Sequence, residues 1–200
     1  MTREELVQKI EELKKEKNAI VLAHYYSNPD VQDIADFLGD SLELSRKAGT
    51  AEADMIVFAG VHFMAETAAL ISPKKKVLVP ALGAGCTLAD GACGKDLADW
   101  KAANPDGTIV SYVNTTAEVK SHTDICCTSA NALSIVKGLP EEKKVFFVPD
   151  KNLGAYMAMV ALDVKIYKLC EAVSRYLVIL IYPEVILVNE HLDSALSCPV

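Results

Sequence analysis

The sequence predicts an α/β fold in which parallel sheets are covered by helices. Short apolar runs alternate with helical segments over most of the chain, and the connections between them are short, as is typical of βα units. Apolar residues make up 51% of the 200 residues and charged residues 24%, which suits a globular protein with a sizeable core. The net charge of −7 argues against a nucleic-acid surface, which needs clustered Lys and Arg.

The order of elements follows from the apolar periodicity. Leu6, Ile10 and Leu13 recur at helical spacing among Glu and Lys, so an amphipathic helix opens the chain. Strands are expected at 19–23, 55–59, 77–79, 108–113, 124–127 and 145–148. Helices are expected at 31–38, 62–70, 96–103, 117–121, 130–136 and 153–160. The recurring βα unit predicts parallel sheets with buried strands.

Two helix starts are marked by their sequence. Pro29 suits the first turn of the helix expected at 31–38, which Gly39 ends. Asp40 with Glu43 three residues later predicts a capping box for a further helix. Ser41 should therefore lie in the first turn of that helix, among unpaired backbone N–H groups that favour anions.

Composition suggests two α/β domains followed by a different tail. A glycine-containing break near 83–94 predicts a first domain over 1–84 and a second over 85–168. The segment 169–200 has no glycine and contains strongly apolar runs, but these are too short and interrupted for a membrane span. The amino terminus is charged and has no apolar segment typical of a secretory signal, so we expect a cytoplasmic protein.

Polar side chains follow the predicted strands where each strand ends. They are His24, Tyr26, Cys86, Tyr112, Asn114, Thr128, Ser129 and Asp150. Parallel strands place these ends on one edge of a sheet, which is where open α/β sheets bind ligands. Two such edges facing each other would gather the polar groups around one cavity. Each residue also has a structural interpretation: the tyrosines as packing residues, the serines as helix-start residues and the cysteine as a buried hydrophobe.

Common cofactor motifs are absent from the sequence. GAGCTLADG is not a dinucleotide fingerprint, because Leu88 stands at the third glycine position, and no P-loop occurs. The cysteines, at 86, 93, 126, 127, 170 and 198, lack CxxC or zinc-finger spacing. We interpret Cys126 and Cys127 as packing residues on a strand. Ser129 is expected to cap the helix that follows it.

Several long blocks of the chain, taken in order, resemble the quinolinate synthase family. They are AHYYSNPDVQDIADFLGDSLELSRKA, GVHFMAETAALISPKKKVLVP, AGCTLAD, YVNTTAEVK, CTSANA and PDKNLGAY. The resemblance implies Rossmann-like three-layer domains around a pseudo-threefold axis, two of the family's three being present here. It implies an enzyme of de novo NAD synthesis that condenses iminoaspartate with dihydroxyacetone phosphate to quinolinate, losing phosphate and water.

The resemblance also implies a cofactor, a partner and a set of site residues. The cofactor is a [4Fe–4S] cluster that acts as a Lewis acid, and L-aspartate oxidase is the upstream source of iminoaspartate. Nucleic-acid and membrane partners are not expected. By motif, the catalytic residues are His24, Tyr26 and Tyr112, and Cys86 is a cluster ligand. The substrate-binding residues are His24, Ser41, Tyr112, Asn114 and Ser129.

The resemblance fails towards the carboxyl terminus. Cys170 lacks the Trp, Gly and His that surround the family's second cluster cysteine, and Cys198 is not in a family motif. We therefore expect the chain to be truncated and divergent after about residue 158, with little stable cluster and little activity. Two alternatives stay open: a non-catalytic fragment, and an iron-independent α/β enzyme acting on small anionic metabolites.

Overall fold

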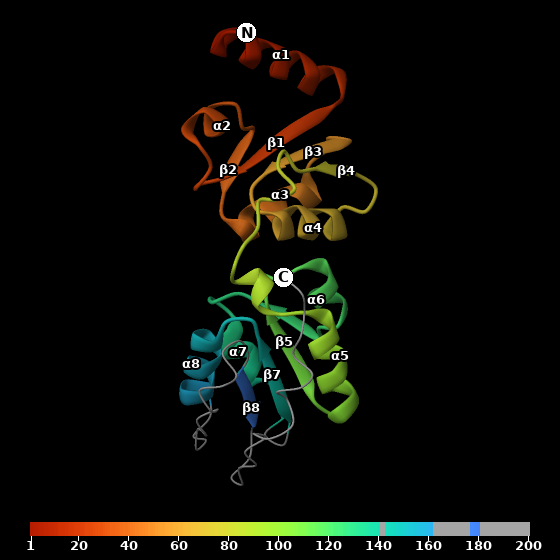
Figure 1. Ribbon diagram of the computed structural model, residues 1–200, viewed down its shortest axis with the longest axis vertical. Coiled ribbons are helices and arrows are strands. Elements are labelled where there is room, and N and C mark those ends of the chain that lie inside the picture. Colours follow the sequence, from red (N-terminus) through yellow and green to blue (C-terminus); the bar gives the residue numbers. More distant parts are fainter. Residues whose placement is uncertain (141–142, 162–176, 181–200) are drawn as a thin grey trace. The chain divides into compact units, whose positions relative to one another are not determined.

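The computed structural model describes residues 1–140, 143–161 and 177–180. The chain divides into two compact units, Met1–Cys86 and Thr87–Val200, each with its own sheet (Figure 1). The boundaries expected from composition, 84/85 and 168/169, stay predictions. Within the described part of the chain, no helix combines the length and the apolar character needed to cross a membrane.

The first unit is a parallel four-stranded sheet in the order β2-β1-β3-β4. Its elements are α1 (Arg3–Glu16), β1 (Ala19–His24), α2 (Pro29–Asp33), β2 (Phe37–Gly39), α3 (Ser41–Thr50), β3 (Met55–Ala59), α4 (His62–Ile71) and β4 (Lys76–Leu78). Helix α1 lies on one face of the sheet, and α3 and α4 lie together on the other (Figure 1). The fully buried core side chains include Leu22, Leu44, Ile56 and Phe58.

The second unit has the sheet order β6-β5-β7-β8. Its elements are η1 (Ala89–Gly91), α5 (Gly94–Ala103), β5 (Thr108–Tyr112), α6 (Ala117–Ser121), β6 (Ile125–Cys127), α7 (Ala132–Lys137), β7 (Lys144–Val148), α8 (Lys151–Ala161) and β8 (Leu177–Leu180). Strands β5, β6 and β7 are parallel, whereas β8 pairs antiparallel with β7.

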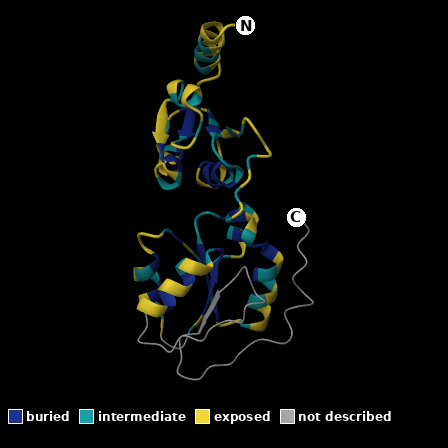
Figure 2. Cartoon of the chain, turned by 60° about the vertical axis from the view of Figure 1, so that its left-hand side comes forward, coloured by how far each residue is buried: buried dark blue, intermediate teal, exposed yellow. Residues whose placement is uncertain are grey.

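Successive residues of the central strand β5 enter different cores of the second unit. Ile109 belongs to a cluster with Leu97 of α5 and Val119 of α6. Val110 belongs to a cluster with residues of α7 and α8, including Met157. Side chains alternate between the two faces of a strand, so this sheet is buried on both faces, as a parallel sheet requires. Figure 2 shows the buried residues concentrated along the strands, with exposed residues on the outer helix surfaces.

The helices begin where the sequence supplies caps. Thr2 and Glu5 form a capping box at α1, and Asp40 and Glu43 form the expected one at α3. The reciprocal bonds satisfy amides that would otherwise lack partners at a helix start. The predicted α/β fold with parallel strands is confirmed in both units.

One expectation about the elements is wrong. The helix expected at 31–38 ends at Asp33, and Phe37–Gly39 is the edge strand β2. The backbone of Asp36 pairs with β1, which draws the residues after it into the sheet. In the apolar segment after residue 168, the described part is β8, which pairs with β7. The remainder of that segment lies outside the described residues.

Candidate functional site

His24 and Tyr26 form a stacked aromatic pair at the carboxyl end of β1. Their ring centroids are 3.9 Å apart with an interplanar angle of 26°. The backbone N–H of Tyr26 donates to His24 Nδ1 at 3.3 Å, which fixes the imidazole relative to the turn. The side-chain amide of Gln32 donates to the carbonyls of Tyr25 and Ser27, so helix α2 holds this turn in place.

The Tyr26 hydroxyl is held at the start of α4. It accepts a hydrogen bond from the N–H of Val61 at 3.0 Å and lies 3.8 Å from Met64 Sδ. Val61 occupies the N-cap position of α4, and Met64 at the third helix position cannot accept from its N–H as the Glu of a capping box does, so a tyrosine from another element satisfies that amide. Because the hydroxyl accepts from Val61, the acceptor that the described residues offer to its own proton is the weakly accepting Met64 sulfur. That proton is therefore available to a bound ligand.

The two side chains differ in their protonation behaviour. Burial lowers the pKa of His24 below its usual value, and the nearby Asp40 carboxylate opposes this shift. The imidazole is therefore mainly neutral at pH 7, and its unprotonated nitrogen is Nδ1, which takes up a proton by releasing the bond from the Tyr26 N–H. Burial raises the pKa of Tyr26, the Val61 N–H opposes this, and Cys86 adds a smaller raising effect. The pair thus combines a neutral base with a protonated acid.

Cys86 lies on the loop that follows β4, in the same unit. Its thiol is half-buried and unpaired in any disulfide. The loop is attached to α4 because the N–H of His62 donates to the carbonyl of Ala84 at 2.8 Å. In the first unit, His24 and Tyr26 follow β1 and Cys86 follows β4, so all three come after the carboxyl ends of strands in one parallel sheet. Their convergence on one site stays a prediction.

Ser41 is the first residue of α3, as expected, but the helix start is not free. Asp40 Oδ1 accepts from the backbone N–H groups of Leu42 and Glu43 at 2.9 and 2.8 Å. The expectation of unpaired amides around Ser41 is therefore wrong for these two. An anion at this helix start would have to use the N–H and hydroxyl of Ser41 or displace the Asp40 carboxylate.

Tyr112 and Asn114 stand at the corresponding end of β5 in the second unit. Strand β5 ends at Tyr112, one residue before the end expected at 113. A bond from the N–H of Val113 to the carbonyl of Cys127 at 2.8 Å nevertheless keeps this segment beside β6. Asn114 Oδ1 is buried and is the one side-chain polar atom in the described ranges that is buried without a hydrogen-bond partner.

Ser129 does not cap a helix. Helix α7 begins at Ala132 with Asn131 at its N-cap position, and Ser129 is an exposed turn residue before it. The Asn131 side chain accepts instead from the N–H of Thr128 at 2.6 Å, which tightens the turn. Asp150, the polar residue after β7, accepts from the first amides of α8 and serves as its cap.

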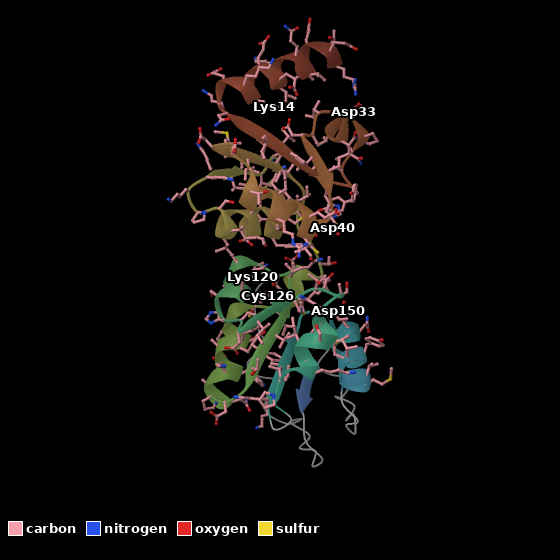
Figure 3. All side chains as sticks on the ribbon, turned by 180° about the vertical axis from the view of Figure 1, so that it is seen from behind. Lys14, Asp33, Asp40, Lys120, Cys126 and Asp150 are labelled. Carbon is pink, nitrogen blue, oxygen red and sulfur yellow. The ribbon has the colours of Figure 1, made fainter. Side chains whose placement is uncertain are left out.

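The adjacent cysteines of β6 differ in environment. Cys127 packs in the second unit's core, as expected, whereas Cys126 is exposed, so its assignment to packing is wrong. Burial raises the pKa of Cys127 to about 12, and the neighbouring Cys126 contributes. Figure 3 labels Cys126 beside Lys120. With its pKa near 12, the Cys127 thiol is a poor metal ligand at neutral pH, because metals bind the thiolate.

The described residues offer few of the thiolates that an iron–sulfur cluster needs. Iron–sulfur clusters are held by several cysteine thiolates. Among the described residues, no group of three or more His, Cys, Asp or Glu is placed to hold a metal ion. Cys86 supplies one suitable thiol, so the described residues do not complete a cluster site. Cys170 and Cys198 lie outside the described residues.

Two site features were not found from the sequence. Val61 and Met64 contact the Tyr26 hydroxyl, and both belong to the stretch VHFMAE. The signal was the lack of Glu or Gln three residues after Val61, which leaves the Val61 amide to a partner from elsewhere in the chain. The expectation that the edges of both sheets meet around one cavity stays a prediction.

Comparison with known proteins gives a consistent result. The family model described as "Quinolinate synthetase A protein" matches residues 8–174. The quinolinate synthase of Nostoc sp. (strain PCC 7120) is 59% identical over 148 residues, which cover 74% of this chain and 46% of the relative. That of a strain of Thermus thermophilus is 54% identical over 160 residues, covering 80% of this chain and 52% of the relative.

The chain spans about half the length of the curated relatives it matches. Identity at this level lies far above chance and covers both described units. The family match also continues to residue 174, beyond the divergence expected near residue 158. The chain therefore belongs to the quinolinate synthetase A family.

Proposed function

We propose that this chain serves the synthesis of quinolinate from iminoaspartate and dihydroxyacetone phosphate, with loss of phosphate and water. The observation that carries the proposal is the His24–Tyr26 pair at the carboxyl end of β1. Condensation, dehydration and ring closure all need proton transfers at neutral pH. A neutral imidazole stacked on a protonated phenol supplies both a base and an acid within one site.

The remaining site residues are proposed to hold the substrates. Ser41 and Ser129 offer hydroxyl donors that suit carboxylate or phosphate oxygens. Tyr112 offers a further hydroxyl, and Asn114 Oδ1 is an acceptor without a partner that an N–H or O–H of a substrate would satisfy. Leaving such an acceptor unpaired costs about 1–3 kcal/mol, so a donating ligand would be favoured there.

The family implies a [4Fe–4S] cluster, which when bound supplies an open iron that polarises substrate oxygens as a Lewis acid. Cys86 is the proposed ligand from this chain. Because the described residues offer one suitable thiol, no proton transfer proposed here passes through the cluster. His24 takes up a proton from the condensing substrate at Nδ1, in place of the bond from the Tyr26 N–H, and the Tyr26 hydroxyl donates one to a departing oxygen.

The proposed setting is the de novo route to NAD in the cytoplasm. L-Aspartate oxidase is the proposed source of iminoaspartate, since an unstable imine must be supplied by an oxidation of an amino acid. Neither a nucleic acid nor a membrane is proposed as a partner. The chain alone is proposed to bind substrate but to hold little cluster and to turn over slowly.

Anaerobic reconstitution with iron and sulfide tests the proposal. We expect weak cluster absorbance that Cys86→Ser removes and Cys126→Ser, a matched exposed thiol, leaves unchanged. Calorimetry should detect binding of dihydroxyacetone phosphate that Ser41→Ala weakens. Quinolinate, measured by chromatography, should form slowly or only in trace amounts.

Other outcomes favour the alternatives. Absence of both cluster absorbance and dihydroxyacetone phosphate binding would overturn the proposal and favour a non-catalytic fragment. The single suitable thiol among the described residues is the observation that favours this second candidate. A colourless preparation that makes product without iron would favour an iron-independent enzyme.

A further inference from the structure

An aspartate joins two strands at the amino-terminal edge of the first sheet. The N–H of Asp36 donates to the carbonyl of Val21 at 2.9 Å, and the N–H of Val21 donates to Asp36 Oδ2 at 2.7 Å. Both backbone groups of one β1 residue are thus bound by one residue that immediately precedes β2. We call this two-bond arrangement the first latch.

The second sheet repeats the arrangement with different neighbours in sequence. The N–H of Asp124 donates to the carbonyl of Ile109 at 3.0 Å, and the N–H of Ile109 donates to Asp124 Oδ2 at 2.8 Å. Asp124 immediately precedes β6 and Ile109 lies in β5. This second latch therefore joins the corresponding pair of strands.

A lysine from the preceding helix completes each latch. Lys14 Nζ lies 2.9 Å from Asp36 Oδ1, and Lys101 Nζ lies 2.9 Å from Asp124 Oδ2. Each lysine is the third residue from the end of its helix and also donates to a backbone carbonyl. Figure 3 shows Lys14 on the side of α1 that faces the sheet. Such agreement in two units with different sequences indicates a repeated construction rather than a chance contact.

The candidate site residues stand at equal distances along the chain from the two latches. His24 and Tyr112 each follow the latched β1 or β5 residue by three positions, and Tyr26 and Asn114 follow it by five. Ser41 and Ser129 each follow the latch aspartate by five positions. Two backbone bonds at the carboxyl ends of the strands correspond in the same way. The Tyr25 N–H donates to the Gly39 carbonyl in the first unit, and the Val113 N–H donates to the Cys127 carbonyl in the second.

The edge strands need help to keep their register. Strands β2 and β6 each have three residues, so their own ladders provide few hydrogen bonds. Phe37 and Leu38 of β2 are exposed, so burial of an apolar face does not select one register either. A slip of one residue would move Ser41 by about 3.3 Å along the sheet and reverse the faces of β2.

We propose that Asp36 and Asp124 are positioning residues that set the register of β2 on β1 and of β6 on β5. They thereby place Ser41 beside His24 and Ser129 beside Tyr112 from the opposite edge of each sheet. The consequence for substrate binding rests on the proposed function. The register itself is independent of it, so the test uses the chain without substrate or cluster.

The test measures native-state amide exchange and chemical shifts by NMR. In Asp36→Ala we expect the Tyr25 amide to shift and to exchange roughly tenfold faster or more, as expected when a strand hydrogen bond is lost. The Val113 amide should be unchanged in that variant. Asp124→Ala should give the reverse result, so each unit is the control for the other.

Further variants separate positioning from general stabilisation. Lys14→Met removes the ion pair but keeps the two strand bonds, and should leave the Tyr25 amide in place. Asp36→Asn keeps an acceptor for Val21 and should largely restore the Tyr25 shift. Asp99→Asn removes an exposed ion pair with Lys95 on α5 and should change neither reporter amide.

Two results would overturn the inference. One is an unchanged Tyr25 amide in Asp36→Ala together with an unchanged Val113 amide in Asp124→Ala. If the alanine variants do not fold, Asp36→Asn and Asp124→Asn decide, because the Val21 and Ile109 amide signals must move when the carboxylate that accepts from them becomes a carboxamide. Static signals would show that the latch bonds do not form.

Discussion

The two units share a frame and differ at the edge where the candidate site residues lie. In the first unit this edge satisfies its own polar groups: Tyr26 accepts from Val61, and Asp40 accepts from the start of α3. In the second unit, Asn114 Oδ1 is buried without a partner, and α7 has no side-chain cap. Under the proposed function, the first unit orients the acid–base pair His24 and Tyr26, and the second unit presents Asn114 Oδ1 as an acceptor for substrate.

If the frames are equivalent, matched core positions should cost the same when truncated. Phe58 and Phe147 lie opposite corresponding residues of the central strands, and both are 0% exposed. We expect Phe58→Ala and Phe147→Ala each to lower the free energy of unfolding by about 3–5 kcal/mol, as is usual for buried Phe. Denaturant unfolding followed by amide exchange would assign each loss to its unit.

Phe37→Ala is the matched control, because this side chain is 41% exposed. Its effect should be below about 1 kcal/mol, the range of surface substitutions. A large loss at one buried phenylalanine and a small one at the other would contradict the equivalence.

The thiols should separate the units by reactivity. With its pKa raised to about 12 by burial, Cys127 should alkylate roughly a thousandfold more slowly than a free cysteine near neutral pH. Cys86, half-buried on a loop, should label well before Cys127. Mass spectrometry after timed iodoacetamide treatment measures both, and unfolding in urea should abolish the difference. Equal labelling of the two thiols in the folded chain would break the comparison.

The proton-transfer role of the first unit predicts a loss of turnover without loss of structure. Tyr26→Phe should slow quinolinate formation in the reconstituted chain by roughly a hundredfold, within the range for losing a general acid. The Val61 amide should also exchange faster, since its acceptor is removed. Tyr25→Phe is the control, because Tyr25 is as exposed as Tyr26 at the same turn, whereas the Val61 N–H donates to Tyr26. Undiminished turnover in Tyr26→Phe would remove this hydroxyl from the proton path.

The smallest effect concerns acid stability of the second unit. Burial alone would raise the pKa of Asp124, but the bonds from Ile109 and Lys101 outweigh it and hold the pKa below its usual 3.8. Its stabilising contribution is therefore present above that value and is lost as pH falls through the lower, folded-state pKa. Urea midpoints of the wild type and Asp124→Asn should differ at neutral pH and converge in acid.

Local signals accounted for much of the fold and part of the site. The apolar run before His24 and the spacing of Asp40 and Glu43 are contained within a few residues, so their strand end and helix start could be predicted. Strand β2 could not, because its pairing depends on Asp36 binding Val21 from across the sheet. Apolar side chains at 37 and 38 suit a helix equally well when that contact is unknown.

The interactions that were missed are long-range ones. Ser129 is an acceptable cap by residue type. The Thr128 N–H donates instead to the Asn131 side chain, and the helix begins at Ala132. The role of Val61 beside Tyr26 requires two elements that only the folded sheet brings together. Antiparallel β8 likewise comes from a segment without βα periodicity.

The short outer strands have a consequence for how the protein behaves in solution at high concentration. Strands β2, β4 and β6, each of three residues, lie at sheet edges, where open N–H and C=O groups could pair with another chain. So short an edge offers few bonds to such a partner. Lys47 Nζ lies 3.6 Å from the centroid of the exposed Phe37 ring, so a positive charge at the β2 edge opposes self-association there.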